Sequence, residues 1–214
     1  AEQHRYIASQ VKLVTNQRKV NCLIILTGRV DADIRTIQNV SLLLGEAKLF
    51  VTGKDALVSQ CCEKALLSNE HHVSDIKQQS EELYSFALLV LRDGDLLHPQ
   101  ALAMFFSKMP NVTSESVIYC DVDSLDQSGK RHLGEFYPDW NPDLQLSTGY
   151  VKTGIVIEGK QTISSLLCFA QQHNQTSMIA LWMSELYLSK SSIEINHIEY
   201  CLVHQTFAPD MQWA

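Results

Sequence analysis

Short runs of consecutive apolar residues alternate with longer segments in which apolar residues recur every three or four positions. Unbroken apolar runs are typical of strands covered on both faces, as in a parallel sheet, and the longer spacing is typical of amphipathic helices. The predicted strands are Cys22–Leu26, Lys48–Thr52, Phe86–Leu91, Val117–Cys120, Val151–Ile157 and Ile193–Ile198, with a short candidate at His71–Ser74. The predicted helices are Asp31–Leu44, Ala56–Leu67, Asp75–Tyr84, Gln100–Lys108, Gln161–Gln171 and Met178–Leu188.

The first hundred residues therefore alternate strand, helix, strand, helix, strand. This order predicts parallel strands joined by right-handed crossovers. We expect an α/β fold with a single Rossmann-like, mostly parallel sheet flanked by helices. Residues 1–20 are polar and have no strong period, so we expect an N-terminal lead-in there and one domain at 21–214. Two segments rich in turn-forming residues, 121–130 and 135–143, are expected to be irregular.

Composition narrows the functional classes. The 214 residues are 45% apolar with a net charge of −7, which suits one sizeable acidic domain. An acidic surface argues against binding a nucleic-acid backbone, which requires clustered Lys and Arg. No apolar run approaches the roughly 20 residues of a membrane span. No signal peptide is visible, and the six cysteines lie mostly within apolar stretches without a C-x-x-C pair, so we expect a cytoplasmic protein.

Three strings in the middle of the chain occur in a specific order and spacing. They are Leu91-Arg92-Asp93-Gly94-Asp95-Leu96-Leu97-His98-Pro99-Gln100-Ala101-Leu102, Tyr119-Cys120-Asp121-Val122-Asp123, and Phe136-Tyr137-Pro138-Asp139-Trp140-Asn141-Pro142-Asp143, the last followed by Ser147 and Tyr150. Together they resemble the central part of the family 2 glycosyltransferases. The segment from His197 through Leu202 to His204 is similar to that family's closing His-Ile-Pro-x-x-Leu-x-His.

The resemblance implies a nucleotide-diphospho-sugar transferase (GT-A) type of fold. It also implies transfer of a sugar from a nucleotide-sugar donor to a glycan acceptor, with inversion at the anomeric carbon, in glycan or polysaccharide biosynthesis. Family members carry a donor-binding Asp, a metal-binding acidic motif and a catalytic base. Each of these parts has a counterpart to look for in this chain.

The family's donor-binding acid follows the second strand, where this chain has Asp55. The resemblance assigns Asp55 to the nucleotide sugar, whereas its position directly before Ala56 predicts an N-cap, and we favour the cap. Trp140 offers an aromatic face on which a sugar can stack, and the alternative is that it packs against the protein and holds its loop in place.

The family's metal motif corresponds to Asp93 and Asp95, which would hold Mg²⁺ or Mn²⁺ against the donor diphosphate. A gapless alignment, however, places Arg92 and Gly94 on the two acidic positions. The alternative is an acidic turn in which Asp95 binds nearby backbone N–H groups.

The family's catalytic base precedes a late helix, but residues 177–184 contain no acid. Inversion requires a carboxylate that removes the proton of the acceptor hydroxyl. Candidates for a substitute base are Asp121, Asp123 and Glu185.

Three hypotheses follow from these incomplete motifs. The first is an active sugar transferase with an altered site. The second is a catalytically degenerate glycosyltransferase-type domain that binds a glycan or a partner beside a neighbouring domain in a longer protein. The third, an unrelated nucleotide-binding Rossmann-like domain, is disfavoured because no glycine-rich phosphate loop follows Leu26.

Overall fold

The computed structural model describes residues 20–26, 30–44, 49–53, 56–60, 73–75, 87–109, 115–126, 128–173, 177–189 and 193–206. The strands are β1 (Val20–Ile25), β2 (Leu49–Thr52), β3 (Val73–Asp75), β4 (Ala87–Arg92), β5 (Asp95–Leu97), β6 (Ser116–Leu125), β7 (Arg131–Glu135), β8 (Ile155–Glu158) and β9 (Glu194–Thr206). The labelled helices are α2 (Val30–Leu44), α4 (Ala101–Lys108), α5 (Pro142–Thr148), α6 (Lys160–Gln172) and α7 (Met178–Leu188), and residues 56–60 are also helical. Of the predicted helix Asp75–Tyr84, Asp75 is the last residue of β3 and the rest falls outside the described residues, as does the second half of the predicted helix Ala56–Leu67.

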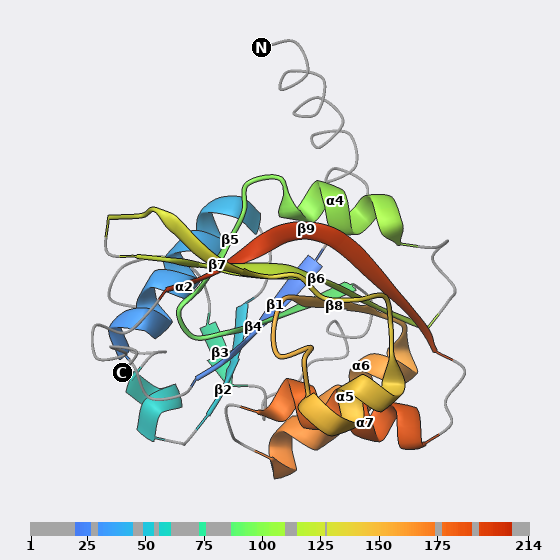
Figure 1. The fold of residues 1–214 in the computed structure, drawn as a ribbon. Coiled ribbons are helices and arrows are strands. Elements are labelled where there is room, and N and C mark those ends of the chain that lie inside the picture. The colour runs from blue at the N-terminus through green and yellow to red at the C-terminus, as the bar shows by residue number, and fades with distance from the viewer. Residues whose placement is uncertain are drawn as a thin grey trace.

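The described strands form one sheet in the order β3-β2-β1-β4-β8-β6-β9-β5, and β7 pairs with β6 (Figure 1). Strands β1 to β4 are parallel to their neighbours on that side of the sheet, and β6 is parallel to β9. Strand β8 is antiparallel to both β4 and β6, so those two strands share one direction. Six of the nine strands therefore run the same way, and the predicted α/β fold with a mostly parallel sheet is confirmed.

Side chains of the central strands alternate between two hydrophobic cores, as the two-residue period of a strand requires. Within β4, Leu89 and Leu91 pack with residues of α2 and α4, and Leu88 and Val90 pack with residues of α6 and α7. Figure 1 shows α2 and α4 on one side of the sheet and α5, α6 and α7 on the other. Because both faces are covered, strand β4 reads in the sequence as an unbroken apolar run.

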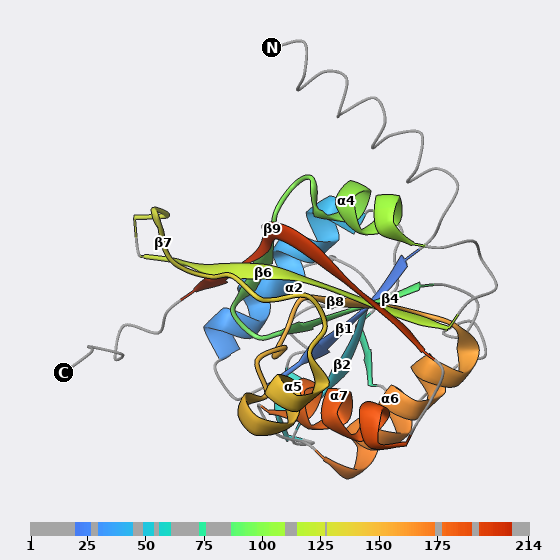
Figure 2. The ribbon, with the colours of Figure 1, turned by 45° about the vertical axis from the view of Figure 1, so that its right-hand side comes forward.

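The acidic segment after Cys120 is a strand and not the predicted loop. Strand β6 continues to Leu125 because β9 pairs with its whole length, from Ser116 opposite Glu194 to Leu125 opposite Thr206. The register shifts on both sides of Asp121, and such bulges re-aim side chains along a strand. Figure 2 shows β7 and the end of β6 extending beyond the helices.

The Pro-rich segment 135–143 is only partly irregular. Pro142 begins α5, at a position where a helix needs no N–H donor. The Asn141 side chain caps this helix by accepting a hydrogen bond from Leu144 N at 2.9 Å. The prediction that 135–143 is irregular was therefore wrong at both ends of the segment, for Glu135, the last residue of β7, and for Pro142 and Asp143, which begin α5.

Candidate functional site

Strands β1, β2 and β4 end at one level of the sheet. Ile25 pairs with Thr52 on one side and with Arg92 on the other, and Asp93 N donates to Ile25 O at 3.1 Å. We call these strand ends and the residues that follow them the carboxyl edge. Open α/β sheets bind ligands at this edge, so it is the first place to look for a functional site.

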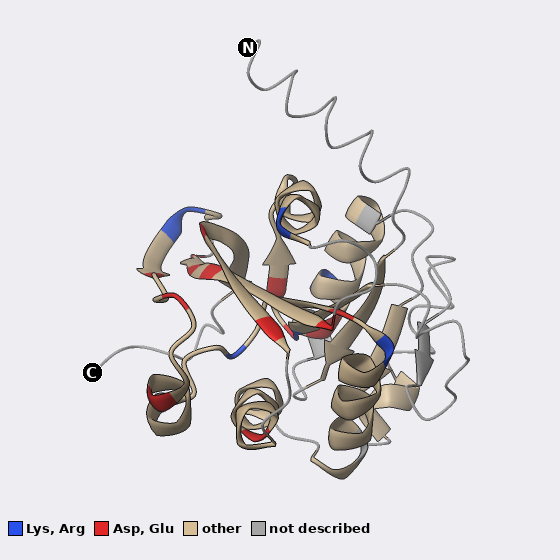
Figure 3. Ribbon diagram, turned by 90° about the vertical axis from the view of Figure 1, so that its right-hand side faces the viewer, with Lys and Arg blue, Asp and Glu red and all other residues tan. Residues whose placement is uncertain are grey.

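The same level continues across β8 to β6. Val90 and Tyr119 both pair with Ile155, so Arg92 and Asp121, each two residues further along, lie at corresponding heights on either side of β8. In Figure 3 acidic positions lie along the strands that cross the centre of the view. The Asp93–Asp95 turn and Asp121 therefore lie at one level of the sheet, with β8 between their strands.

The Asp93–Asp95 turn is held tightly by the protein itself. Gly94 adopts a φ of 79°, which a glycine tolerates, and links β4 to β5. One Asp95 oxygen, Oδ2, accepts hydrogen bonds from Arg92 N at 2.7 Å and from the Thr153 hydroxyl. The side chains of both acids are buried. Burial, offset in part by Arg92, raises the pKa of Asp95 to about 6.

Arg92 contributes a positive charge at this turn. Its side chain is partly buried, and its Nε atom has no hydrogen-bond partner among the described residues. In the gapless alignment with the family 2 glycosyltransferases, Arg92 occupies a position where the family has an acid. The resemblance therefore assigns Arg92 no role.

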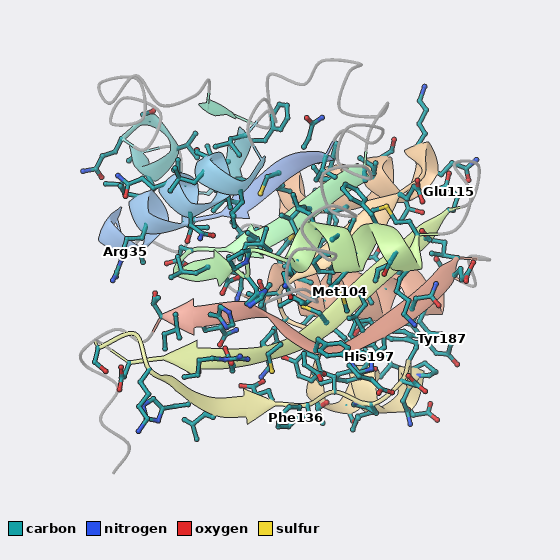
Figure 4. The ribbon with its side chains drawn as sticks, turned by 90° about the horizontal axis from the view of Figure 1, so that it is seen from above. Arg35, Met104, Glu115, Phe136, Tyr187 and His197 are labelled. Atoms are coloured by element: carbon teal, nitrogen blue, oxygen red, sulfur yellow. The ribbon has the colours of Figure 1, made fainter. Side chains whose placement is uncertain are left out.

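Asp121 is paired with a histidine from the last strand. His197 Nε2 lies 2.9 Å from Asp121 Oδ1, and Tyr137 N donates to the same oxygen at 2.9 Å. The carboxylate can only accept, so Nε2 carries the proton and Nδ1 is left as an acceptor in the neutral ring. His197, which Figure 4 labels, also stacks on Tyr119, and the two ring centroids lie 4.7 Å apart. Its buried Nδ1 forms no hydrogen bond with any residue that the structure describes, and it lies 3.7 Å from Oδ1 of the exposed Asp139.

Asp123 has a second histidine partner. It accepts hydrogen bonds from Arg131 Nε and from His204 Nδ1. His204 in turn meets His98 edge-on, with the ring centroids 5.6 Å apart. Burial, together with the neighbouring His204 and Arg131, lowers the pKa of His98. Both candidate bases on β6 are therefore engaged with cationic or imidazole groups.

Trp140 packs within an aromatic cluster. Its ring lies 6.4 Å from those of Tyr119 and Tyr150, and it is partly buried against the core. The loop around it is fixed by the Tyr119 hydroxyl, which donates to Pro138 O at 2.6 Å. These contacts favour the packing interpretation of Trp140, although one part of the side chain remains accessible.

The remaining candidates are not brought to this edge by any contact of the described residues. Glu185 is exposed on α7, whose first turn contains no acid. Asp55 lies outside the described residues. Across the part of the chain that the structure describes, no three His, Cys, Asp or Glu side chains are grouped so as to hold a metal ion.

Sequence reasoning missed the partners of the carboxylates. His197 and His204 lie in the segment that resembles the family's closing motif. The sequence analysis therefore identified these two histidines but did not predict that they pair with Asp121 and Asp123. Thr153 and Arg131 carry no recognisable motif. Their contacts with Asp95 and Asp123 depend on strand pairing that spacing alone does not reveal.

Comparison with known proteins gives local matches. No protein-family model matches the chain. It is 32% identical over 113 residues, 51% of its length, to the O-antigen biosynthesis protein RfbC of Myxococcus xanthus, and 32% identical over 81 residues, 37% of its length, to the uncharacterized protein y4gI of Sinorhizobium fredii. The aligned parts make up 8% and 9% of these relatives, so the chain spans only a small part of them.

Two solved structures are similar at low identity. One is the inositol-1-phosphate CTP transferase from T. maritima, with 13% identity, a TM-score of 0.41 and coverage of 89% of this chain and 90% of that one. The other is a Bacillus anthracis protein described as a glucose-1-phosphate thymidylyltransferase, with 9% identity, a TM-score of 0.40 and coverage of 84% and 87%. Among the described helices, none is long and apolar enough to span a membrane.

Proposed function

We propose that the chain is a glycosyltransferase-type domain for glycan or polysaccharide biosynthesis, which binds a nucleotide sugar at its carboxyl edge. The Asp93–Asp95 turn at the end of β4 lies level with Asp121, which sits at the bulge within β6. This alignment carries the proposal, because the carboxyl edge is where such sheets bind ligands. The local sequence similarity to an O-antigen biosynthesis protein also supports a role in polysaccharide biosynthesis.

A degenerate domain is the second candidate, and specific observations favour it. The first turn of α7 has no acid, Glu185 is exposed, and Asp121 and Asp123 are each engaged with a histidine. Loss of a positioned general base typically costs a factor of roughly 10² to 10⁴ in rate. We therefore expect little sugar transfer by this chain alone, and a role in binding a glycan or a neighbouring domain.

Two measurements test the proposal. Calorimetric titration with UDP, GDP, CDP, ADP and dTDP, each with Mn²⁺ and with EDTA, detects donor binding. An assay with the matching nucleotide sugars then detects hydrolysis or transfer. If no nucleotide binds at millimolar concentration, the nucleotide-sugar proposal is wrong, and brisk transfer by the wild-type chain would contradict the degenerate alternative.

An acid restored before α7 separates the two candidates further. Ser177 is exposed at the N-cap of α7, so Ser177→Asp places a carboxylate there without burying it, whereas Met178 is buried in the core. A rise in transfer for Ser177→Asp would indicate that the rest of the site is intact. The matched control is Ser107→Asp, which adds the same charge to an exposed position of α4.

A further inference from the structure

The Asp93–Asp95 turn does not fit a divalent cation well. Mg²⁺ and Mn²⁺ need carboxylate oxygens that are free to face the ion. Asp95 Oδ2 is instead occupied by Arg92 N and the Thr153 hydroxyl, both donors from the protein. Arg92, the residue before the turn, also carries a permanent positive charge, and that charge repels a metal ion. Two features therefore disfavour a metal at this turn: the protein itself occupies one Asp95 oxygen, and the neighbouring side chain is positively charged.

Arg92 itself is the unusual group at this edge. It is the last residue of β4 and stands level with the last residues of β1 and β2, Ile25 and Thr52. A buried N–H without a partner destabilises the protein by about 1–3 kcal/mol. The Nε of Arg92 is such a group. A ligand that accepts a hydrogen bond from the N–H would remove this cost.

Glu135, two residues before Tyr137, already has partners within the protein. Glu135 Oε2 lies 3.6 Å from Lys152 Nζ and accepts from the Tyr137 hydroxyl at 3.2 Å. No ion pair between the Arg92 side chain and a carboxylate is formed within the described residues, although the charge of Arg92 acts on both Asp95 and Tyr137. The guanidinium is thus held at the edge without a carboxylate bound to it.

We propose that Arg92 binds the phosphate groups of the nucleotide ligand directly, in the place where a divalent cation would otherwise neutralise them. This inference rests on the proposed nucleotide-sugar function. A guanidinium presents several N–H donors in a plane and binds phosphate oxygens in pairs, with a charge that no proton equilibrium removes at neutral pH. Nucleotide binding by this chain is then independent of metal.

The test uses the full chain and the nucleoside diphosphate that binds best, with UDP as the first probe. In EDTA, wild type binds with the same affinity as in Mn²⁺. Arg92→Ala weakens binding by about 10- to 100-fold, the loss typical of one charge-assisted interaction, and Arg92→Lys retains part of it. Arg92→Asp makes binding depend on Mn²⁺. Lys108→Ala, an exposed cation at the end of α4, is the matched control and leaves affinity unchanged.

The outcomes are distinct. If wild type binds the nucleotide only with Mn²⁺, and Arg92→Lys and Arg92→Ala bind it equally well, the inference is overturned but the proposed function stands. Absence of binding by every diphosphate, with or without Mn²⁺, overturns both. Thermal unfolding followed by circular dichroism identifies a variant that fails to fold, and Arg92→Lys, which keeps charge and length, then decides the result.

Discussion

His197 and Asp121 are joined by a hydrogen bond of 2.9 Å although 76 positions separate them in the chain. The two side chains are 2% and 4% exposed, so the pair is almost completely removed from water. Without His197, the buried Asp121 carboxylate keeps the hydrogen bond from Tyr137 N but loses the one from the ring. The loss of a hydrogen bond to a charged group costs about 1.5–3 kcal/mol. We expect His197→Ala to lower the free energy of unfolding in urea by that amount.

The chain provides a matched control on its surface. His132 and Asp126 form a pair of similar length, 2.8 Å, but their side chains are 42% and 39% exposed. His132→Ala is expected to cost less than about 1 kcal/mol. Equal losses for the two variants would mean that burial does not set the strength of the His197–Asp121 pair.

Asp95 predicts a specific dependence of stability on pH. Its pKa is raised to about 6, from an ordinary value of about 4, so the folded state binds this proton more tightly than the unfolded state does. Its contribution is fully present below the unfolded pKa and is lost as pH rises through about 6. Relative to Asp95→Asn, wild type should lose about 2 to 3 kcal/mol of unfolding free energy between pH 4 and pH 7.5.

Urea unfolding of both proteins across this pH range measures the effect. Asp126→Asn is the control of opposite sign, because hydrogen bonds from Ser128 and His132 lower the pKa of Asp126. The contribution of Asp126 is present above its unfolded pKa and is lost as pH falls through the folded one. Parallel curves for wild type and Asp95→Asn would contradict the prediction.

Gly154 is expected to tolerate no side chain. Its φ of 68° is left-handed, and an added Cβ would lie 2.9 Å from Val203 Cγ2 and 3.2 Å from Cys120 Sγ. Gly129 has a similar φ of 78° but nothing within 4 Å. Gly129→Ala should therefore cost only the backbone strain, about 1–2 kcal/mol, and Gly154→Ala an additional 1–3 kcal/mol for overpacking. Chemical denaturation compares them, and equal costs would show that the sheet relaxes around the new methyl group.

The sequence predicted the strands and helices better than the contacts at the carboxyl edge. Strand β4 and helix α7 were recognised because an unbroken apolar run and a helical period record burial directly. The extension of β6 through Asp121 and Asp123 was missed because acidic residues ordinarily indicate a loop. Their charges are compensated by His197, His204 and Arg131, which lie on other strands and cannot be assigned as partners from local spacing.

Glu115 is expected to stabilise helix α6 from outside it. Its carboxylate accepts hydrogen bonds from Gln161 N at 3.1 Å and from Thr162 N at 2.8 Å, whereas the N-cap residue of the helix is Gly159, which has no side chain. Glu115→Ala should lower the unfolding free energy by about 0.5–2 kcal/mol, as the loss of a cap does.

Two further variants identify the cause of that loss in the same urea experiment. Glu115→Gln keeps a side-chain acceptor and should lose less than Glu115→Ala. Glu199→Ala removes an acid from an exposed position of β9 and is the control. If Glu199→Ala costs as much as Glu115→Ala, the capping explanation is incorrect.

The position of β9 within the sheet determines when the sheet can form fully during synthesis of the chain. The last described strand is not added at an outer edge but is inserted between β6 and β5, and its register spans all of β6. A ribosome-bound chain that lacks residues 194–206 leaves Asp121 and Asp123 without their histidines and leaves the edges of β5 and β6 unpaired. Such edges promote association between chains, and pairing over this sequence distance is slow. The nascent chain therefore remains prone to aggregation until β9 has emerged.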